Sequence, residues 1–201
     1  GVGRRVRFFR ADMRDFDRQP RLGTFDLAFN LINTIRHLGG DAAMLAHLRG
    51  VGAVLAPGGA YAVGLHLCAY GQETETEDLW EGRRGGVRVQ QVVQYLPPMG
   101  PQGEAARAER VISHLTVTRG ARVTHLDSTY ALRGYNLAQW RALLARAGWV
   151  VEGVTSGAGE ARVEGHGRAP FVNAGSRVDA LSIAKAVSRC RGRLSRLVGN
   201  S

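Results

Sequence analysis

The stretch Phe25-Asp-Leu-Ala-Phe-Asn-Leu-Ile32 is a nearly continuous apolar run with the length of one strand. Such a run is typical of a strand buried on both faces, as in a parallel sheet. A second run, Ala60-Tyr-Ala-Val-Gly-Leu-His-Leu67, has the same character. Between them, Asp41 can cap a helix, and Pro57-Gly58-Gly59 is expected to stop it and turn the chain. This order predicts a right-handed parallel strand-helix-strand unit of an α/β sheet.

Two further segments extend this unit. Upstream, Val6-Arg-Phe-Phe-Arg-Ala11 is short, rich in residues that favour strands, and ends at Asp12. Downstream, Asn136 can cap a second helix that ends at Gly148, and Trp149 to Thr155 follows as a strand candidate. Residues 156–176 are rich in glycine and are expected to form a long loop or hairpin arm. A last strand is expected over Val178 to Ala184.

A different pattern lies between the second apolar run and the second helix. Three segments alternate partly between apolar and polar residues: Val87 to Leu96, Arg110 to Thr118 and Val123 to Leu132. This alternation predicts an antiparallel sheet with one wet face, inserted into or laid over the α/β layer at about residues 87–132. The acidic run Glu73 to Asp78 is expected to be a loop. It could attract a cationic amine, or it could simply be solvated.

The excess of basic over acidic residues has two interpretations. Among 201 residues there are 27 Lys and Arg against 17 Asp and Glu, which gives a net charge of +10, and Lys185 is the only lysine. Arginine can recognise phosphate, but a lack of lysine also reflects GC-rich codon usage. The tail, residues 185–201, carries no acid. It could be an amphipathic helix that binds nucleic acid or anionic lipid, or a loosely packed terminal helix.

Other classes of protein are disfavoured by composition. A hydrophobic content of 44% excludes a disordered chain, and no apolar run approaches the ~20 residues of a membrane span. Cys68 and Cys190 are too few for a disulfide scaffold, so a reducing, cytoplasmic setting is expected.

Three quoted segments carry a resemblance to a known family. The segments Val6-Arg-Phe-Phe-Arg-Ala-Asp-Met-Arg-Asp-Phe16, Phe25-Asp-Leu-Ala-Phe-Asn30 and Leu55-Ala-Pro-Gly-Gly-Ala-Tyr-Ala-Val63, in that order and spacing, resemble class I S-adenosylmethionine-dependent methyltransferases. The likeness covers about residues 5–155 and is closest to the small-molecule type with an inserted antiparallel sheet. It implies a Rossmann-like α/β fold, S-adenosyl-L-methionine as cofactor and a small-molecule amine or hydroxyl acceptor.

The resemblance also implies a cofactor site at the carboxyl ends of the strands. There Asp12 would accept from the adenine amino group, and Met13 would offer its backbone N–H and apolar side chain to the ring. Asn30 and Leu31 would lie near the methionine part of the cofactor. Taken without the resemblance, Asp12 is equally a loop-capping residue, Met13 a core filler and Asn30 an ordinary residue at a strand end.

Two histidines near this edge are candidates for a general base. His37 follows the first apolar run and His66 ends the second, and either could take a proton from an acceptor because imidazole titrates near neutral pH. Transfer of a methyl group from a sulfonium is an in-line displacement, which needs positioning rather than a protein nucleophile or a metal. No metal site is expected.

The first motif of this family, a strand followed by a Gly-rich loop over the cofactor, is absent from the given sequence. We therefore expect residues 1–184 to be an incomplete methyltransferase domain, the C-terminal portion of an enzyme, with a gap or an unpartnered edge in its sheet. Such a chain would bind the cofactor weakly on its own. The alternative is a non-catalytic remnant whose arginines bind nucleic acid.

Overall fold

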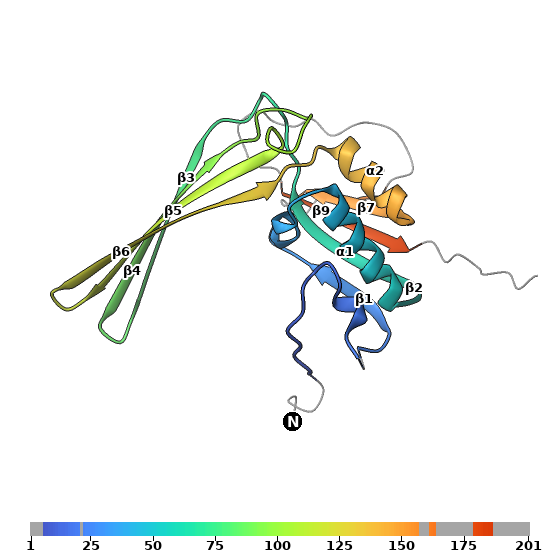
Figure 1. Cartoon of the computed structure of the whole chain (residues 1–201), viewed down its shortest axis with the longest axis horizontal. Coiled ribbons are helices and arrows are strands. Elements are labelled where there is room, and N and C mark those ends of the chain that lie inside the picture. The colour runs from blue at the N-terminus through green and yellow to red at the C-terminus, as the bar shows by residue number, and fades with distance from the viewer. Residues whose placement is uncertain (1–5, 21, 157–160, 164–178, 187–201) are drawn as a thin grey trace, which may run out of the picture.

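The computed structural model describes residues 6–20, 22–156, 161–163 and 179–186. Two sheets are formed within these ranges: a five-stranded sheet in the order β1-β2-β9-β7-β8 and a four-stranded sheet in the order β3-β4-β5-β6. The four-stranded sheet projects from the rest of the molecule as a long arm (Figure 1). The fold is therefore mixed α/β with an appended antiparallel sheet, as expected.

The predicted parallel unit is confirmed. Strand β1 (Phe25–Asn30) pairs in parallel with β2 (Leu55–His66), and α1 (Asp41–Val54) connects them after the short 3-10 helix η3 (Thr34–His37). An earlier 3-10 helix, η2 (Phe16–Arg18), packs against α1.

The remaining strands of the first sheet come from the C-terminal part of the chain. Strand β9 (Asp179–Ala186) lies antiparallel between β2 and β7 (Trp149–Ser156), and β8 (Ala161–Val163) pairs with β7. The last strand thus ends at Ala186, two residues beyond its expected limit. The tail from residue 187 onward, like most of the Gly-rich stretch, lies outside the described residues.

Strand β2 begins earlier than predicted. We expected Pro57-Gly58-Gly59 to end the helix, but the helix ends at Val54 and the strand runs through the three residues. The register passes from Phe25 opposite Leu55 to Leu27 opposite Ala60, so the additional residues form a bulge. Gly58 has a φ of 80°, which only glycine adopts without strain.

The prediction of a first strand over Val6–Ala11 is wrong. These residues form no ladder, and Phe8 is 93% exposed. The prediction that β1 is buried on both faces is also wrong, since Phe29 is 71% exposed and Leu27 is exposed as well. In both cases a strand partner is lacking. No described strand pairs with Val6–Ala11, and β2 is the only described strand paired with β1, so β1 is an edge strand.

One face of the first sheet is covered by α1 and α2 (Leu137–Ala147) (Figure 1). Helix α2 has the predicted cap: Asn136 accepts from the Gln139 N–H, and Gln139 accepts in return from the Asn136 N–H. Trp149 ties the layers together by donating from Nε1 to the carbonyl of Leu48. The core residues are Ile35, Leu38, Met44, Leu45, Leu48, Val51, Leu55, Tyr61, Val63, Leu65, Tyr135, Trp140, Leu143, Leu144 and Trp149.

The arm has one more strand than the three predicted. Strands β4 (Val87–Leu96), β5 (Ala108–Arg119) and β6 (Arg122–Arg133) match the alternating segments, and β3 (Thr76–Arg84) adds an edge to β4. Part of the acidic run expected to be a loop is therefore strand. Thr76, Glu77 and Asp78 are exposed and polar, so a hydrophobic pattern did not predict a strand there; polar residues are common at a sheet edge.

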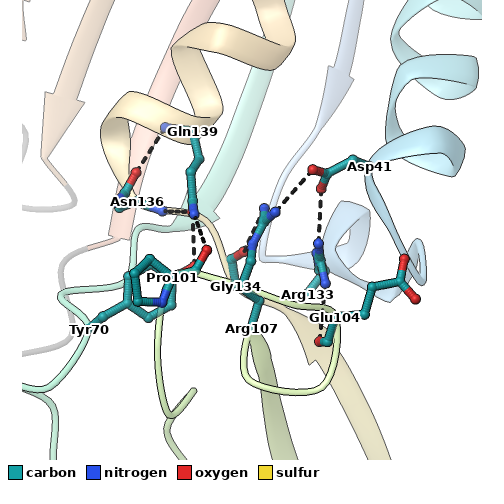
Figure 2. A network of polar contacts seen from close by, with 9 residues as sticks. All are labelled: Asp41, Tyr70, Pro101, Glu104, Arg107, Arg133, Gly134, Asn136 and Gln139. Atoms are coloured by element: carbon teal, nitrogen blue, oxygen red, sulfur yellow. Dashed lines mark hydrogen bonds and ion pairs between the residues drawn. The ribbon is translucent and has the colours of Figure 1, made fainter.

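Arginines hold the arm to the helical layer (Figure 2). Arg107 and Arg133 donate to the two carboxylate oxygens of Asp41, at 3.0 and 3.2 Å, and both guanidinium groups are almost entirely buried. Asp41 is the first residue of α1, Arg107 directly precedes β5, and Arg133 is the last residue of β6. These ion pairs therefore stabilise the junction between the arm and the helical layer.

In the part of the chain that the structure describes, no helix combines the length and apolar character required to cross a lipid bilayer.

Candidate functional site

The carboxyl ends of β1 and β2 lie at one edge of the sheet because the two strands are parallel. Asn33, just after β1, joins them. Its backbone N–H donates to the carbonyl of Gly64 at 3.1 Å, and its side-chain Oδ1 accepts from the backbone N–H of His66 at 2.5 Å. The strand ends predicted to form the site therefore meet.

The backbone at this edge is strained. Ile32 and Asn33 have φ values of 60° and 61°, and a β-branched residue rarely adopts this left-handed region. Gly64 lets the turn approach β2, because a Cβ there would lie 3.3 Å from the Ile32 nitrogen and 3.4 Å from the Leu31 Cα. Strain of this kind is maintained by the surrounding structure and is concentrated at functional sites.

Met13 is the residue that meets β1. Its sulfur lies 3.9 Å from Nδ2 of Asn30, and its side chain packs against the main core. Its carbonyl lies 2.8 Å from Nδ1 of His47, whose Nε2 lies 2.8 Å from the hydroxyl of Tyr61. Burial lowers the pKa of His47, so the neutral imidazole donates to Met13 and accepts from Tyr61.

Asp12 has a different partner. Its carboxylate accepts two hydrogen bonds from the guanidinium of Arg14, at 2.9 and 2.7 Å, and a third from the Arg14 backbone N–H. These hydrogen bonds lower the pKa of Asp12 to about 2. Among the described residues, no hydrogen bond joins Asp12 to Asn30, so the two predicted residues are linked only through Met13.

Asn30 carries a buried polar atom that the protein does not satisfy. Its Oδ1 has no hydrogen-bond partner, although its Nδ2 faces Met13. A buried acceptor without a partner is costly unless a ligand donates to it. Leu31, the next residue, is exposed beside this atom at the rim.

His37 lies at the end of η3 and is exposed. Its ring centroid lies 5.3 Å from that of Tyr130 on β6, so the arm contributes an aromatic side chain next to the candidate base. The sequence pattern did not single out Tyr130, because the contact joins residues far apart in the chain.

His66 is buried and held by an acid. Its Nε2 lies 2.9 Å from Oε1 of Glu73, which also accepts from the Ala69 N–H, and its Nδ1 is buried with no partner. Burial raises the pKa of Glu73, but the hydrogen bonds from His66 and Ala69 outweigh burial and leave the pKa lowered. The sequence placed Glu73 in a solvated loop and gave no signal for this pair.

His66, Cys68 and Glu73 form a group of three potential metal ligands, with ligand atoms within 4.8 Å of one another. Two observations disfavour a cation here. Burial raises the pKa of the Cys68 thiol to about 11, so the ligand thiolate is unfavourable. The positive guanidinium of Arg36 also acts on both Cys68 and Glu73.

No protein-family model matches the chain, and no curated protein matches it. Solved structures do match. DesVI from Streptomyces venezuelae has a TM-score of 0.61 at 20% identity, and the match covers 88% of this chain and 64% of DesVI.

Two further solved structures are similar. CalS10 from Micromonospora echinaspora, an amino pentose methyltransferase solved with S-adenosylmethionine bound, gives a TM-score of 0.55 at 22% identity over 87% of this chain and 62% of CalS10. The sugar N-methyltransferase KedS8 from Streptoalloteichus sp. gives a TM-score of 0.59 at 18% identity over 88% of this chain and 60% of KedS8.

The chain therefore has the fold of the class I S-adenosylmethionine-dependent methyltransferases. It spans less than two thirds of the length of each of these neighbours. The identities are low, so these similarities establish the fold alone.

Proposed function

We propose that this chain is the part of an S-adenosylmethionine-dependent methyltransferase that binds the adenine and methionine ends of the cofactor and positions a small-molecule amine or hydroxyl acceptor. The observation that carries the proposal is the edge formed by Asn30, Ile32 and Asn33. There a strained turn and a buried, unsatisfied amide oxygen lie at the ends of two parallel strands in a methyltransferase fold.

The residues present fit the cofactor. Asn30 Oδ1 is an acceptor for the ammonium group of the methionine part, and Leu31 lies beside it as an exposed apolar side chain. Asp12 is an acceptor for the adenine amino group. Met13, whose backbone carbonyl is held by His47, supplies an apolar side chain. When bound, S-adenosylmethionine supplies an electrophilic methyl group on its sulfonium.

We propose that His37 acts as the general base that takes a proton from the acceptor. Its imidazole is exposed at the rim and rests against Tyr130, so it can reach a bound acceptor. His66 is less suited to meet an acceptor, because it is buried and its Nε2 is held by Glu73. The remaining task of the protein is to orient the acceptor and exclude water.

Two of the similar structures support an amine as the acceptor. CalS10 is described as an amino pentose methyltransferase and KedS8 as a sugar N-methyltransferase. We propose an amine on a sugar as the acceptor, taken between His37 and the face of the arm that carries Tyr130. That the reaction occurs in the cytoplasm remains a prediction from the cysteine content.

Further protein surface is needed for tight cofactor binding. Leu27 and Phe29 are exposed on β1, and the edge of β1 away from β2 has no partner strand among the described residues. We propose that residues 1–184 belong to one methyltransferase domain whose complete form covers this edge. We therefore expect the chain alone to bind the cofactor weakly.

The test is binding of S-adenosylhomocysteine by the full chain, measured by saturation-transfer difference NMR. We expect weak transfer to the adenine and ribose protons that Asn30→Ala and Asp12→Asn reduce. The matched control is Asp78→Asn, an exposed acid of β3 that leaves transfer unchanged. Equal transfer in all variants would refute the site, and tight binding by the unmodified chain would refute the need for further surface.

The nucleic-acid alternative is not supported by the buried arginines. Arg36, Arg107 and Arg133 donate to protein acceptors and are buried, so they cannot contact phosphate. That alternative would be supported if the chain bound DNA at low salt and the binding weakened steeply as the salt concentration rose.

A further inference from the structure

A cluster of histidines lies on the arm, away from the methyltransferase site. In the β5–β6 ladder, His114 stands opposite Asp127 and Thr116 stands opposite His125, so the four side chains share one face of the sheet. Val111 and Tyr130 are directly opposite each other on the other face, which is the one that contacts His37. The cluster is therefore separate from the proposed acceptor site.

One ring nitrogen of each histidine lies close to the other. Nε2 of His114 lies 3.3 Å from Nδ1 of His125, and the rings are stacked with centroids 5.2 Å apart. The hydroxyl oxygen of Thr116 lies 3.3 Å from the first nitrogen and 3.2 Å from the second. Two nitrogens and one oxygen thus form a nearly equilateral triangle.

Asp127 favours one tautomer of the neutral His114 ring. Its Oδ1 lies 2.5 Å from Nδ1 of His114, so Nδ1–H donates to the carboxylate and Nε2 keeps its lone pair. A carboxylate behind a histidine in this way is the usual support of a metal-bound imidazole, because it fixes the tautomer and makes the ligand more basic.

The spacing matches a tetrahedral metal ion. With Zn–N bonds of about 2.0–2.1 Å, two imidazole nitrogens on a tetrahedral ion lie about 3.3 Å apart. Strand alternation places four arginines on this face: Arg83, Arg88, Arg110 and Arg133. Arg83 and Arg88 are paired with Glu81, and Arg133 is paired with Asp41. Asp127 supplies a negative charge beside the pair.

We propose that His114 and His125 bind a divalent transition metal of the zinc class, with Asp127 as the supporting carboxylate. Thr116 hydrogen-bonds to a water on the ion, and the remaining positions are open to solvent, since both histidines lie on the accessible surface of the arm. The ion links β5 to β6 and stabilises the hairpin. Without metal, a hydrogen bond joins the two ring nitrogens.

The test is calorimetric titration of Zn²⁺ into the full chain at neutral pH after treatment with a chelator. We expect one ion per chain. His114→Ala and His125→Ala should each abolish binding, and Asp127→Asn should weaken it about 10- to 100-fold. His37→Ala is the matched control and should leave zinc binding unchanged. Circular dichroism of each variant confirms that the exposed substitutions leave the fold intact.

Two outcomes would overturn the proposal. The first is a chain that takes up no zinc, or one that binds zinc equally well when either histidine of the pair is replaced. The second is binding that disappears in Cys68→Ala, which would place the ion at His66, Cys68 and Glu73. Absorption of the Co²⁺ form separates the two sites, because only a cysteine ligand gives thiolate-to-cobalt charge transfer.

Discussion

Nη2 of Arg36 donates to Oε2 of Glu109 at 2.6 Å, and the two side chains are 2% and 5% exposed. Arg36 belongs to η3 and Glu109 to β5, so this ion pair ties the turn that carries His37 to the base of the arm. Nε of Arg36 donates in addition to the carbonyl of Arg133 at 2.8 Å. The position of the candidate base relative to Tyr130 therefore depends on a buried charge pair.

Removing one member of this pair should be costly. We expect Glu109→Ala to lower the free energy of unfolding by about 3–5 kcal/mol, because the guanidinium of Arg36 would remain buried without its carboxylate. The double variant Arg36→Met with Glu109→Met should lose less. Urea denaturation measures both. A double variant less stable than the single one would contradict the argument from an uncompensated charge.

The glycine under the strained turn should be essential. Gly64→Ala places a methyl group 3.3 Å from the Ile32 nitrogen, and we expect a loss of about 1–3 kcal/mol in unfolding free energy together with weaker S-adenosylhomocysteine binding. Gly82→Ala on β3 is the matched control, since no atom lies within 4 Å of its added Cβ. If both substitutions have equal effects, the close approach of the turn to β2 is not important.

Stability should depend on pH through His47. Burial lowers its pKa below the ordinary value of 6.5, so the unfolded chain takes up a proton at a higher pH than the folded chain does. The free energy of unfolding should therefore fall as the pH decreases from 6.5 toward the folded pKa of His47.

The control for this pH effect is His47→Gln, which keeps a donor and an acceptor but does not titrate. Urea midpoints measured through this range should change less in the variant. The lowered pKa values of Glu73 and Asp41 act below 4.5 and do not interfere. An identical slope in the variant would show that another group titrates.

The buried thiol of Cys68 should resist alkylation. Burial raises its pKa from 9.0 to about 11, which reduces the thiolate fraction at mildly alkaline pH about 100-fold. Iodoacetamide should modify Cys68 at least that much more slowly in buffer than in denaturant. Mass spectrometry of the peptides reads Cys68 separately from Cys190. Rapid modification in buffer would mean that the region around Cys68 opens readily.

Elements that depend on local information could be predicted from the amino-acid sequence. The apolar spacing predicted α1, Asn136 and Gly148 bounded α2, and alternation found three strands of the arm. The prediction that Asp41 caps α1 is wrong, because Gly40 is the N-cap and Asp41 is the first residue of the helix. These succeed because caps and periodicity depend on neighbouring residues along the chain. The methyltransferase fold was expected from a resemblance carried by residues 6–16, 25–30 and 55–63.

Which distant residues contact one another could not be predicted from the sequence and is known only from the folded chain. The contacts Met13 to His47, His66 to Glu73 and His37 to Tyr130 join distant segments, and they exist only once the sheets have paired. The same holds for β1: its apolar sequence is typical of a buried strand, yet burial depends on neighbours on both sides, and here it pairs with β2 alone. A strand's own residues set its pattern, whereas its exposure is set by what packs against it.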